Sequence, residues 1–511
     1  MFTPHLNKAV GFPSSWKTEQ QLTFSSTQTE NISIKDSESQ VLQTAECSAQ
    51  TDEAASPSTQ TATVDEPSLL EFLRRVTPDV LEELNKQERS SAFEGYAPVD
   101  DDANTGAQLL HTLRWPQLFS QGVVTGLSWS STGAVVAVAY GSNTHDNWCD
   151  HRAAVALWNI NRCESISISP ERVLEVSSCV PALAFHPSNP AILAFATRTG
   201  EVHVYDLSES ERVTPIATGS TGGSGVTCLL WCSDAGTSSV LAAATEGGHV
   251  LLWTVSLTKE TITLDTGFLV MQEDLPRGYR SVGSVGRVGE SAGIGITCLS
   301  FNSEDPTVFL LGVQGGSVLL CSTQGKIQSG VSVEGVSLLR CVVSSFSGHS
   351  GRVLSCQCSP HHRNALITLA SDSQLKLHSL LQPHHPVATL HSDDSLTTAH
   401  WAPVRSLLIA TATTAGQVNF LDACSLQQSD KSIGSFANTA DDKGKPLLSL
   451  PPPEKPAPVS ALAFNASNVT LVAVGDSLGR VWVWKLPTDV VSPHTTDQAR
   501  LNAVLITAVD D

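Results

Sequence analysis

A 20-residue interval between two large side chains recurs along most of the chain and restricts the folds open to it. The clearest copy runs from Val459 to Lys485, where three short β-branched and aromatic segments are separated by turns rich in Gly, Asp, Ser and Asn. Phe464 ends the first segment and Trp484 ends the third. This alternation predicts three antiparallel strands. Because so small a sheet is marginal in water alone, it must stack on copies of itself.

Six further copies precede this one. Their intervals are 20 residues in four copies, 22 in one and 29 in one, where a polar insertion at residues 141–152 lengthens a turn. Seven units between about residues 123 and 486 predict an all-β fold, a seven-bladed β-propeller. The bounding pairs are Trp129 and Trp158, Phe185 and Tyr205, Trp231 and Trp253, Phe301 and Cys321, Cys358 and His378, and Trp401 and Leu421.

The closing strand and the long interruptions are two further features of the propeller. Apolar runs at both ends, residues 109–119 and residues 501–509, are suited to supply an outer strand that closes the ring, and the sequence does not decide between them. The long interruptions at residues 256–291 and 424–458 are rich in Gly and Pro respectively, and we expect them to be surface loops outside the blades.

The N-terminal segment, residues 1–66, is rich in Ser, Thr, Gln and acidic residues, so we expect it to be disordered alone. A tripeptide recurs in it, with a near copy at Gln50-Thr51. One interpretation is low-complexity drift. The other is a set of linear motifs that bind a partner as added edge strands, with alternating side chains entering pockets. The two full copies are Thr27, Gln28, Thr29 and Thr59, Gln60, Thr61.

Residues 67–89 change character. Ser68 and Glu71 form a capping box, Pro78 fits the start of a second turn set, and a helix-spaced apolar stripe follows. We expect one kinked amphipathic helix or two short ones, which either pack on the propeller or bind a partner. An acidic linker, residues 90–106, leads to the propeller, residues 107–511. The stripe consists of Leu69, Leu70, Leu73, Val76, Leu81 and Leu84.

Composition excludes several classes of protein. The formal net charge of -20 argues against a nucleic-acid-binding protein. No apolar run reaches the roughly 18 residues of a membrane span, and residues 1–16 lack the apolar centre of a signal peptide. We therefore expect a cytosolic chain whose twelve cysteines are thiols.

The sequence lacks several common motifs for catalysis and cofactor binding. The Gly-rich stretches at residues 219–225 and 283–295 lack the Gly-Lys-Ser/Thr ending of a phosphate loop, and no Gly-x-Ser-x-Gly elbow links a strand to a helix. One loop gathers metal-capable residues, but their spacing fits no four-ligand pattern, which favours a solvated polar loop. We expect no catalytic site, metal or cofactor. The loop residues are His145, Asp146, Cys149, Asp150 and His151.

Particular residues give the repeats a family resemblance. Gly348-His349 followed by Ser371-Asp372 in the fifth unit resembles the Gly-His and turn-Asp positions of WD repeats, and Asp476 holds the turn position in the seventh. The Thr-Gln-Thr copies resemble the motif bound by the hub-type dynein light chain. The basic residue that often precedes that motif is missing here.

Tail, helix and propeller in this order resemble the dynein intermediate chains, and the lack of charged heptads in residues 1–20 resembles the shorter type found in cytoplasmic dynein 2. The resemblance implies a non-catalytic subunit whose partners are the dynein 2 heavy chain, hub-type and roadblock-type light chains and a second dynein 2 intermediate chain. It also implies retrograde intraflagellar transport and cilium assembly, with the chain in the cytoplasm, cytoskeleton, cilium axoneme and basal body or centrosome. The alternative is a WD-repeat scaffold of another complex, such as a ubiquitin ligase or a trafficking coat, and an enzyme of propeller fold ranks third.

Overall fold

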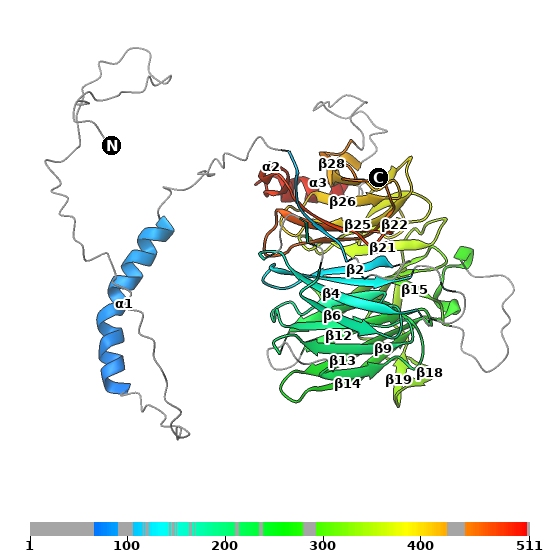
Figure 1. The fold of residues 1–511 in the computed structure, drawn as a ribbon, viewed down its shortest axis with the longest axis horizontal. Coiled ribbons are helices and arrows are strands. Elements are labelled where there is room, and N and C mark those ends of the chain that lie inside the picture. The colour runs from blue at the N-terminus through cyan, green and yellow to red at the C-terminus, as the bar shows by residue number, and fades with distance from the viewer. Residues whose placement is uncertain are drawn as a thin grey trace, which may run out of the picture. The chain divides into compact units, whose positions relative to one another are not determined.

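The repeated units fold as antiparallel sheets that pack against one another in the computed structural model (Figure 1). The described residues are 66–89, 106–115, 117, 122–142, 145, 149, 151–162, 166–167, 169–209, 214–234, 239–279, 293–426 and 445–507. They fall into two units, one within Met1–Tyr96 and one within Ala97–Asp511.

Seven sheets form the ring, and each begins with its innermost strand in chain order. This confirms the predicted seven-bladed propeller. The strands of blades 1 to 3 are β2 (Val123–Trp129), β3 (Val135–Gly141), β4 (Ala153–Asn159) and β6 (Arg172–Val176); β7 (Ala182–Phe185), β8 (Ile192–Ala196), β9 (Glu201–Asp206) and β10 (Ala217–Ser220); and β11 (Val226–Asp234), β12 (Ser239–Thr245), β13 (His249–Ser256) and β14 (Thr261–Leu269).

Blades 4 to 7 follow the same plan, with one additional strand, β5, at the edge of the last blade. Their strands are β15 (Ile296–Phe301), β16 (Val308–Val313), β17 (Val318–Ser322) and β20 (Val342–Ser345); β21 (Val353–Cys358), β22 (Ala365–Ala370), β23 (Gln374–Ser379) and β24 (Ala388–His391); β25 (Leu396–Trp401), β26 (Leu408–Thr413), β27 (Val418–Asp422) and β28 (Leu448–Leu450); and β29 (Val459–Phe464), β30 (Leu471–Asp476), β31 (Val481–Lys485), β1 (Gln108–Leu113) and β5 (Ile166–Ser167).

The sheet register explains the constant interval in the sequence. In the last blade, Phe464 and Trp484 pair from opposite sides with Val472 on the middle strand. Two strands and two tight turns of fixed length therefore set the distance along the chain between the two outer partners. The same pairing occurs in the other six copies, whose middle-strand residues are Val136, Leu193, Leu241, Phe309, Leu366 and Ile409.

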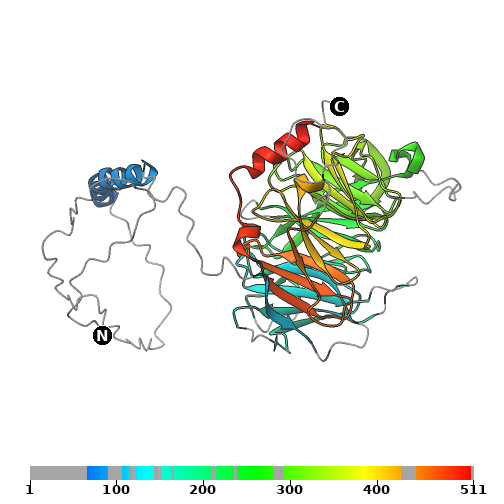
Figure 2. The same cartoon turned by 90° about the horizontal axis from the view of Figure 1, so that it is seen from above.

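The ring is closed by the strand that comes first in the chain. β1 pairs antiparallel with β31, so the blue strand lies beside the orange-red strands of the last blade (Figure 2). Residues 501–507 of the other candidate run lie in a helix, α3 (Asp497–Thr507), preceded by the short α2 (Thr488–Val491). Asp497 of α3 accepts a buried hydrogen bond from Arg405 at 3.2 Å, which anchors the helix on the ring.

The long interruptions contain structure that the sequence did not predict. Each holds the outermost strand of a blade, β14 in the first and β28 in the second, so the expectation that both are loops outside the blades is wrong. A hairpin, β18 (Gln328–Val333) and β19 (Val336–Leu339), leaves blade 4 and joins β14 of blade 3. Short 3₁₀ helices are η2 (Gln272–Asp274), η3 (Arg277–Tyr279) and η4 (Ala423–Leu426).

Buried apolar side chains hold the blades together. They form seven clusters, one between each pair of neighbouring blades. Trp484 lies in the cluster between blades 6 and 7, and Leu113 of the closing strand lies in the one between blades 7 and 1. Because every blade contacts two others, the core is continuous around the ring.

The N-terminal unit contains one described element, α1 (Glu66–Arg89), which continues through Pro78. Proline lacks the N–H for the carbonyl of Arg74. One residue earlier, the Thr77 hydroxyl donates to the carbonyl of Leu73 at 2.6 Å. None of the helices described is both long and apolar enough to cross a membrane.

Candidate functional site

The tail motifs fall outside the described residues. Thr27, Gln28 and Thr29, the pair Gln50-Thr51, and Thr59, Gln60 and Thr61 therefore stay predictions from the sequence. The apolar stripe of α1 lies within the described residues, except for the side chain of Leu84.

The stripe is apolar and largely exposed. Leu69 and Leu73 are 43% and 47% exposed, Leu70 and Leu81 slightly more, and Val76 is partly covered. An apolar stripe on a single helix has no surface of its own to cover it. Exposed apolar surface of this extent marks a region that binds another surface.

One member of the stripe was missed. Val80 is 47% exposed and lies one helical turn from both Val76 and Leu84 in the sequence. Its spacing of four residues from Val76 was the signal that would have identified it. Phe72 at the edge of the stripe is 49% exposed, and the Arg75 guanidinium lies 5.8 Å from the centre of its ring.

A series of buried hydrogen bonds stabilises one face of blade 5. His349 contacts Asp372 through Nδ1 at 3.2 Å and the Thr368 hydroxyl through Nε2 at 2.9 Å. Thr368 in turn contacts His378 Nε2 at 3.0 Å. With Asp372 as the final acceptor, each group donates to the next, from His378 through Thr368 and His349 to Asp372. The Gly-His and turn-Asp residues found in the sequence therefore join the turn between β22 and β23 to the segment before β21.

Burial keeps His349 and His378 neutral. It lowers the pKa of His349 to about 4, helped by the nearby Lys376 and opposed by Asp372. Burial, with His349 and Lys376, lowers the pKa of His378 to about 3. An open pocket of about 680 Å³ lies beside the chain, but Lys376 donates to the Gly348 carbonyl at 2.6 Å and is engaged in holding the turn. We therefore assign this cluster a structural role.

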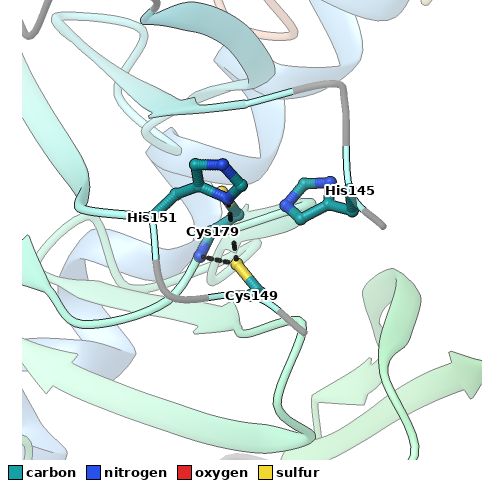
Figure 3. Close-up of side chains that lie close together, drawn as sticks. All are labelled: His145, Cys149, His151 and Cys179. Atoms are coloured by element: carbon teal, nitrogen blue, oxygen red, sulfur yellow. Dashed lines mark hydrogen bonds between the residues drawn. The ribbon is translucent and has the colours of Figure 1, made fainter. Parts of the chain in front are cut away.

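A second polar cluster lies where blades 1 and 2 meet. His145, Cys149 and His151 come from the polar insertion between β3 and β4, and Cys179 joins them from the link between β6 and β7 (Figure 3). One ligand atom from each residue lies within 4.8 Å of the others. Cys179 is buried and the other three side chains are half-buried, rather than solvated as expected.

The two thiols of this cluster differ in acidity. Burial raises the pKa of Cys149, but hydrogen bonds to its sulfur, among them from the Cys179 amide at 3.2 Å and from His151, lower it to about 6. Burial and the neighbouring Cys149 raise the pKa of Cys179 to about 11. The sequence did not identify Cys179 because it lies on a separate segment.

Comparison with known families matches one blade directly. Residues 340–379 match the family described as WD domain, G-beta repeat. This range contains His349 and Asp372, so the repeat that matches is the one whose histidine-to-aspartate chain is complete.

Relatives match nearly the whole chain. It is 34% identical over 488 residues to the mouse protein named cytoplasmic dynein 2 intermediate chain 2, covering 93% of this chain and 87% of the relative. It is 35% identical to the human protein of the same name, covering 83% and 77%. The fruit-fly cytoplasmic dynein 1 intermediate chain is 22% identical over 75% of this chain and 51% of its own length. The chain therefore belongs to the dynein intermediate chain family of WD-repeat proteins, and within it to the cytoplasmic dynein 2 intermediate chain 2 type.

Proposed function

We propose that the chain is a non-catalytic intermediate chain of a cytoplasmic dynein 2 motor that carries out retrograde intraflagellar transport and supports cilium assembly. The observation that carries this proposal is the identity of 34% to the mouse dynein 2 intermediate chain over 93% of this chain. A match of that extent includes residues before the propeller, so it is not a likeness among WD repeats alone.

The propeller is the proposed heavy-chain-binding part. Its seven blades form a closed ring with a continuous core, which presents a rigid surface to a large partner. Closure leaves few free sheet edges, so a partner would contact the loops of either face or the outer rim. Rigid scaffolds of this kind bind without a large loss of conformational entropy.

The N-terminal part is the proposed light-chain-binding part. The exposed stripe of α1 suits a partner with an apolar surface, for which we propose a roadblock-type light chain. The Thr-Gln-Thr copies are the proposed sites of a hub-type light chain. A dimeric light chain has two equal grooves, so it would hold this tail beside that of a second dynein 2 intermediate chain.

The proposed places of action follow from the proposed motor. They are the cytoplasm, the cytoskeleton, the cilium axoneme and the basal body or centrosome. Fluorescent tagging of the full chain in ciliated cells tests them, with enrichment at the ciliary base and along the axoneme as the expected result.

The decisive experiment is purification of the tagged full chain from ciliated cells, followed by mass spectrometry. We expect the dynein 2 heavy chain, both kinds of light chain and a second intermediate chain. Removal of residues 1–89 should keep the heavy chain and lose the light chains. Recovery of a ubiquitin ligase or a coat complex without any dynein subunit would contradict the proposal.

A further inference from the structure

The cluster between blades 1 and 2 contains a complete set of ligands for a metal ion. It offers two sulfurs, from Cys149 and Cys179, and two imidazoles, from His145 and His151, with their ligand atoms within 4.8 Å of one another. Zinc bound tetrahedrally by such ligands holds them about 3.3 to 3.8 Å apart, given Zn–S and Zn–N bonds of about 2.3 and 2.0 Å. A contraction of about 1.5 Å or less therefore converts this arrangement into a zinc site.

The two histidines are oriented toward a common point. Their rings meet edge to face with centres 5.0 Å apart, and His151 Nδ1 lies 4.0 Å from the Cys149 sulfur (Figure 3). His145 Nε2 is buried and has no hydrogen-bond partner among the described residues. Because an unpaired buried nitrogen is costly, this atom indicates a missing partner, and a bound cation would satisfy it.

Backbone amides donate hydrogen bonds to both sulfurs. The Cys179 amide donates to the Cys149 sulfur, and the Ser142 amide donates to the Cys179 sulfur, each at 3.2 Å. Such hydrogen bonds orient metal ligands and stabilise thiolates. The Cys179 carbonyl in turn accepts the Arg198 amide at 2.9 Å, which fixes this ligand on the ring.

A glycine leaves room for the fourth ligand. Gly141 ends β3, and a Cβ atom placed on it would lie 3.2 Å from both Cβ and Sγ of Cys179. That is tighter than an ordinary van der Waals contact. A larger residue at position 141 would push Cys179 away from His145 and Cys149.

The ligand set selects the ion and its role. Two thiolates and two imidazoles suit Zn²⁺ and not Mg²⁺ or Ca²⁺, which prefer oxygen ligands. Four protein ligands leave no open position, which is typical of structural sites. We propose that His145, Cys149, His151 and Cys179 bind one structural Zn²⁺. The motor-subunit function proposed above does not depend on this ion.

Topology shows what the ion would join. Because the strands of a blade alternate in direction, the turn between the second and third strands and the link to the next blade emerge on one face. The insertion between β3 and β4 is the longest of the seven such turns. The ion would fasten it to the link between blades 1 and 2.

Metal analysis of the full chain tests the proposal. The protein would be purified with a histidine-free tag and without chelators, and we expect about one zinc ion per chain. After removal of zinc, Co²⁺ should give the visible absorption of tetrahedral cobalt with thiolate charge-transfer bands. Absence of zinc together with absence of this cobalt spectrum would overturn the proposal.

Variants locate the ion. The double variant Cys149→Ser with Cys179→Ser should retain zinc in fewer than about one chain in ten. Cys232→Ser is the matched control, because Cys232 is a half-buried thiol outside the cluster, and it should retain full zinc. Equal zinc in the double variant and the control would place the ion elsewhere and overturn the proposal.

A measurement on the unmodified chain covers the case in which the double variant does not fold. Alkylation followed by mass spectrometry should find Cys149 and Cys179 protected in the zinc-loaded chain and modified after a chelator is added. Cys424, which lies outside the cluster, should react equally in both samples. A disulfide between Cys149 and Cys179 in the protein isolated from cytosol, or protection that the chelator leaves unchanged, would overturn the proposal.

Discussion

The propeller blades and α1 use the same apolar residues in opposite ways. All six residues of β22 and all six of β30 are buried. In α1, by contrast, Leu70 and Leu81 are 54% and 52% exposed. The ring therefore satisfies its own apolar surface, whereas the helix presents its apolar surface outward.

The difference follows from what each architecture provides. A blade has a neighbour on both sides, so closure of the ring covers both faces of every sheet. A single amphipathic helix covers nothing of its own stripe. We therefore propose that the ring carries the stability of the chain and that α1 carries capacity for binding.

The largest effect is expected where the ring buries an aromatic side chain between blades. Trp484 is 8% exposed and packs in the cluster between blades 6 and 7. Trp484→Ala leaves a cavity there and should lower the free energy of unfolding by about 3 to 5 kcal/mol. Chemical denaturation monitored by circular dichroism measures this loss. The matched control is Leu478→Ala in the same blade, at a side chain 55% exposed, with an expected change within about 0.5 kcal/mol. Equal effects of the two variants would mean that burial of Trp484 between the blades does not stabilise the ring.

The next effect concerns binding through α1. Leu73→Asp places a charge in the middle of the stripe and should weaken attachment of the roadblock-type light chain by about 2 to 4 kcal/mol, since central apolar contacts dominate interfaces. The melting temperature of the propeller should not change. Pull-down and thermal melting of the same preparation measure both outcomes.

The control for this substitution introduces the same residue elsewhere on the helix. Arg75 lies on the side of α1 opposite the stripe by helical spacing, so Arg75→Asp should leave the light chain bound. A fall in the melting temperature of the propeller with Leu73→Asp would mean that the stripe packs on the chain itself.

The sequence predicted the parts of the fold that obey a local rule. The interval between Phe464 and Trp484 predicted the three strands of the blade, because both residues pair with one residue of the middle strand. The outermost strands β14 and β28 were missed because they lie in long interruptions rich in Gly and Pro respectively, and β28 has three residues. The closing strand stayed open because both ends of the chain carry apolar runs and only packing selects one.

The candidate sites show the same limit. Helical spacing predicted the stripe of α1, although Val80 was overlooked, and no sequence rule says which molecule covers it. The ligands His145, Cys149 and His151 were visible as one loop, but the fourth, Cys179, comes from a separate segment. Only the pairing of β3, β4 and β6 in one blade brings the two segments together.

A smaller effect is expected from His349 and His378, buried polar groups that also hold the ring together. The folded-state pKa values of His349 and His378 are lowered to about 4 and about 3 by burial, below the unfolded value of about 6.5. The unfolded chain therefore binds more protons below pH 6.5, and stability should fall as pH drops from 6.5 toward 4. His378→Phe removes one such group and should make the fall shallower by about 1 kcal/mol per pH unit.

Denaturation at several pH values measures this slope. The matched control is His391→Gln, at an exposed histidine of the same blade, and it should leave the slope unchanged. An identical slope for His378→Phe and the control would mean that the buried chain of blade 5 does not titrate between the folded and unfolded states.

The smallest effect is expected from a single tail motif. Each Thr-Gln-Thr copy should bind weakly, because the segment must be ordered on binding and each contact is short. Sites in series multiply through effective concentration, by roughly 10² to 10⁴ over one site. Replacement of Gln60-Thr61 by alanines should therefore cost about tenfold in affinity or less, because the other copies still hold the light chain. Replacement of three pairs together should release the hub-type light chain and weaken pairing with the second tail; the pairs are Gln28-Thr29, Gln50-Thr51 and Gln60-Thr61.

Calorimetry with the purified light chain and a peptide from Leu22 to Asp65 separates the two interpretations of the tail. The matched control peptide carries Ser37→Ala and Ser39→Ala, between the motifs, and should bind like the unchanged peptide. A loss that grows from the single to the triple replacement, with no loss in the control, would extend the division of labour beyond α1 to the tail. If the unchanged peptide gives neither heat nor complex at high micromolar concentration, the repeats are low-complexity drift. Binding capacity before the propeller would then rest on α1 alone.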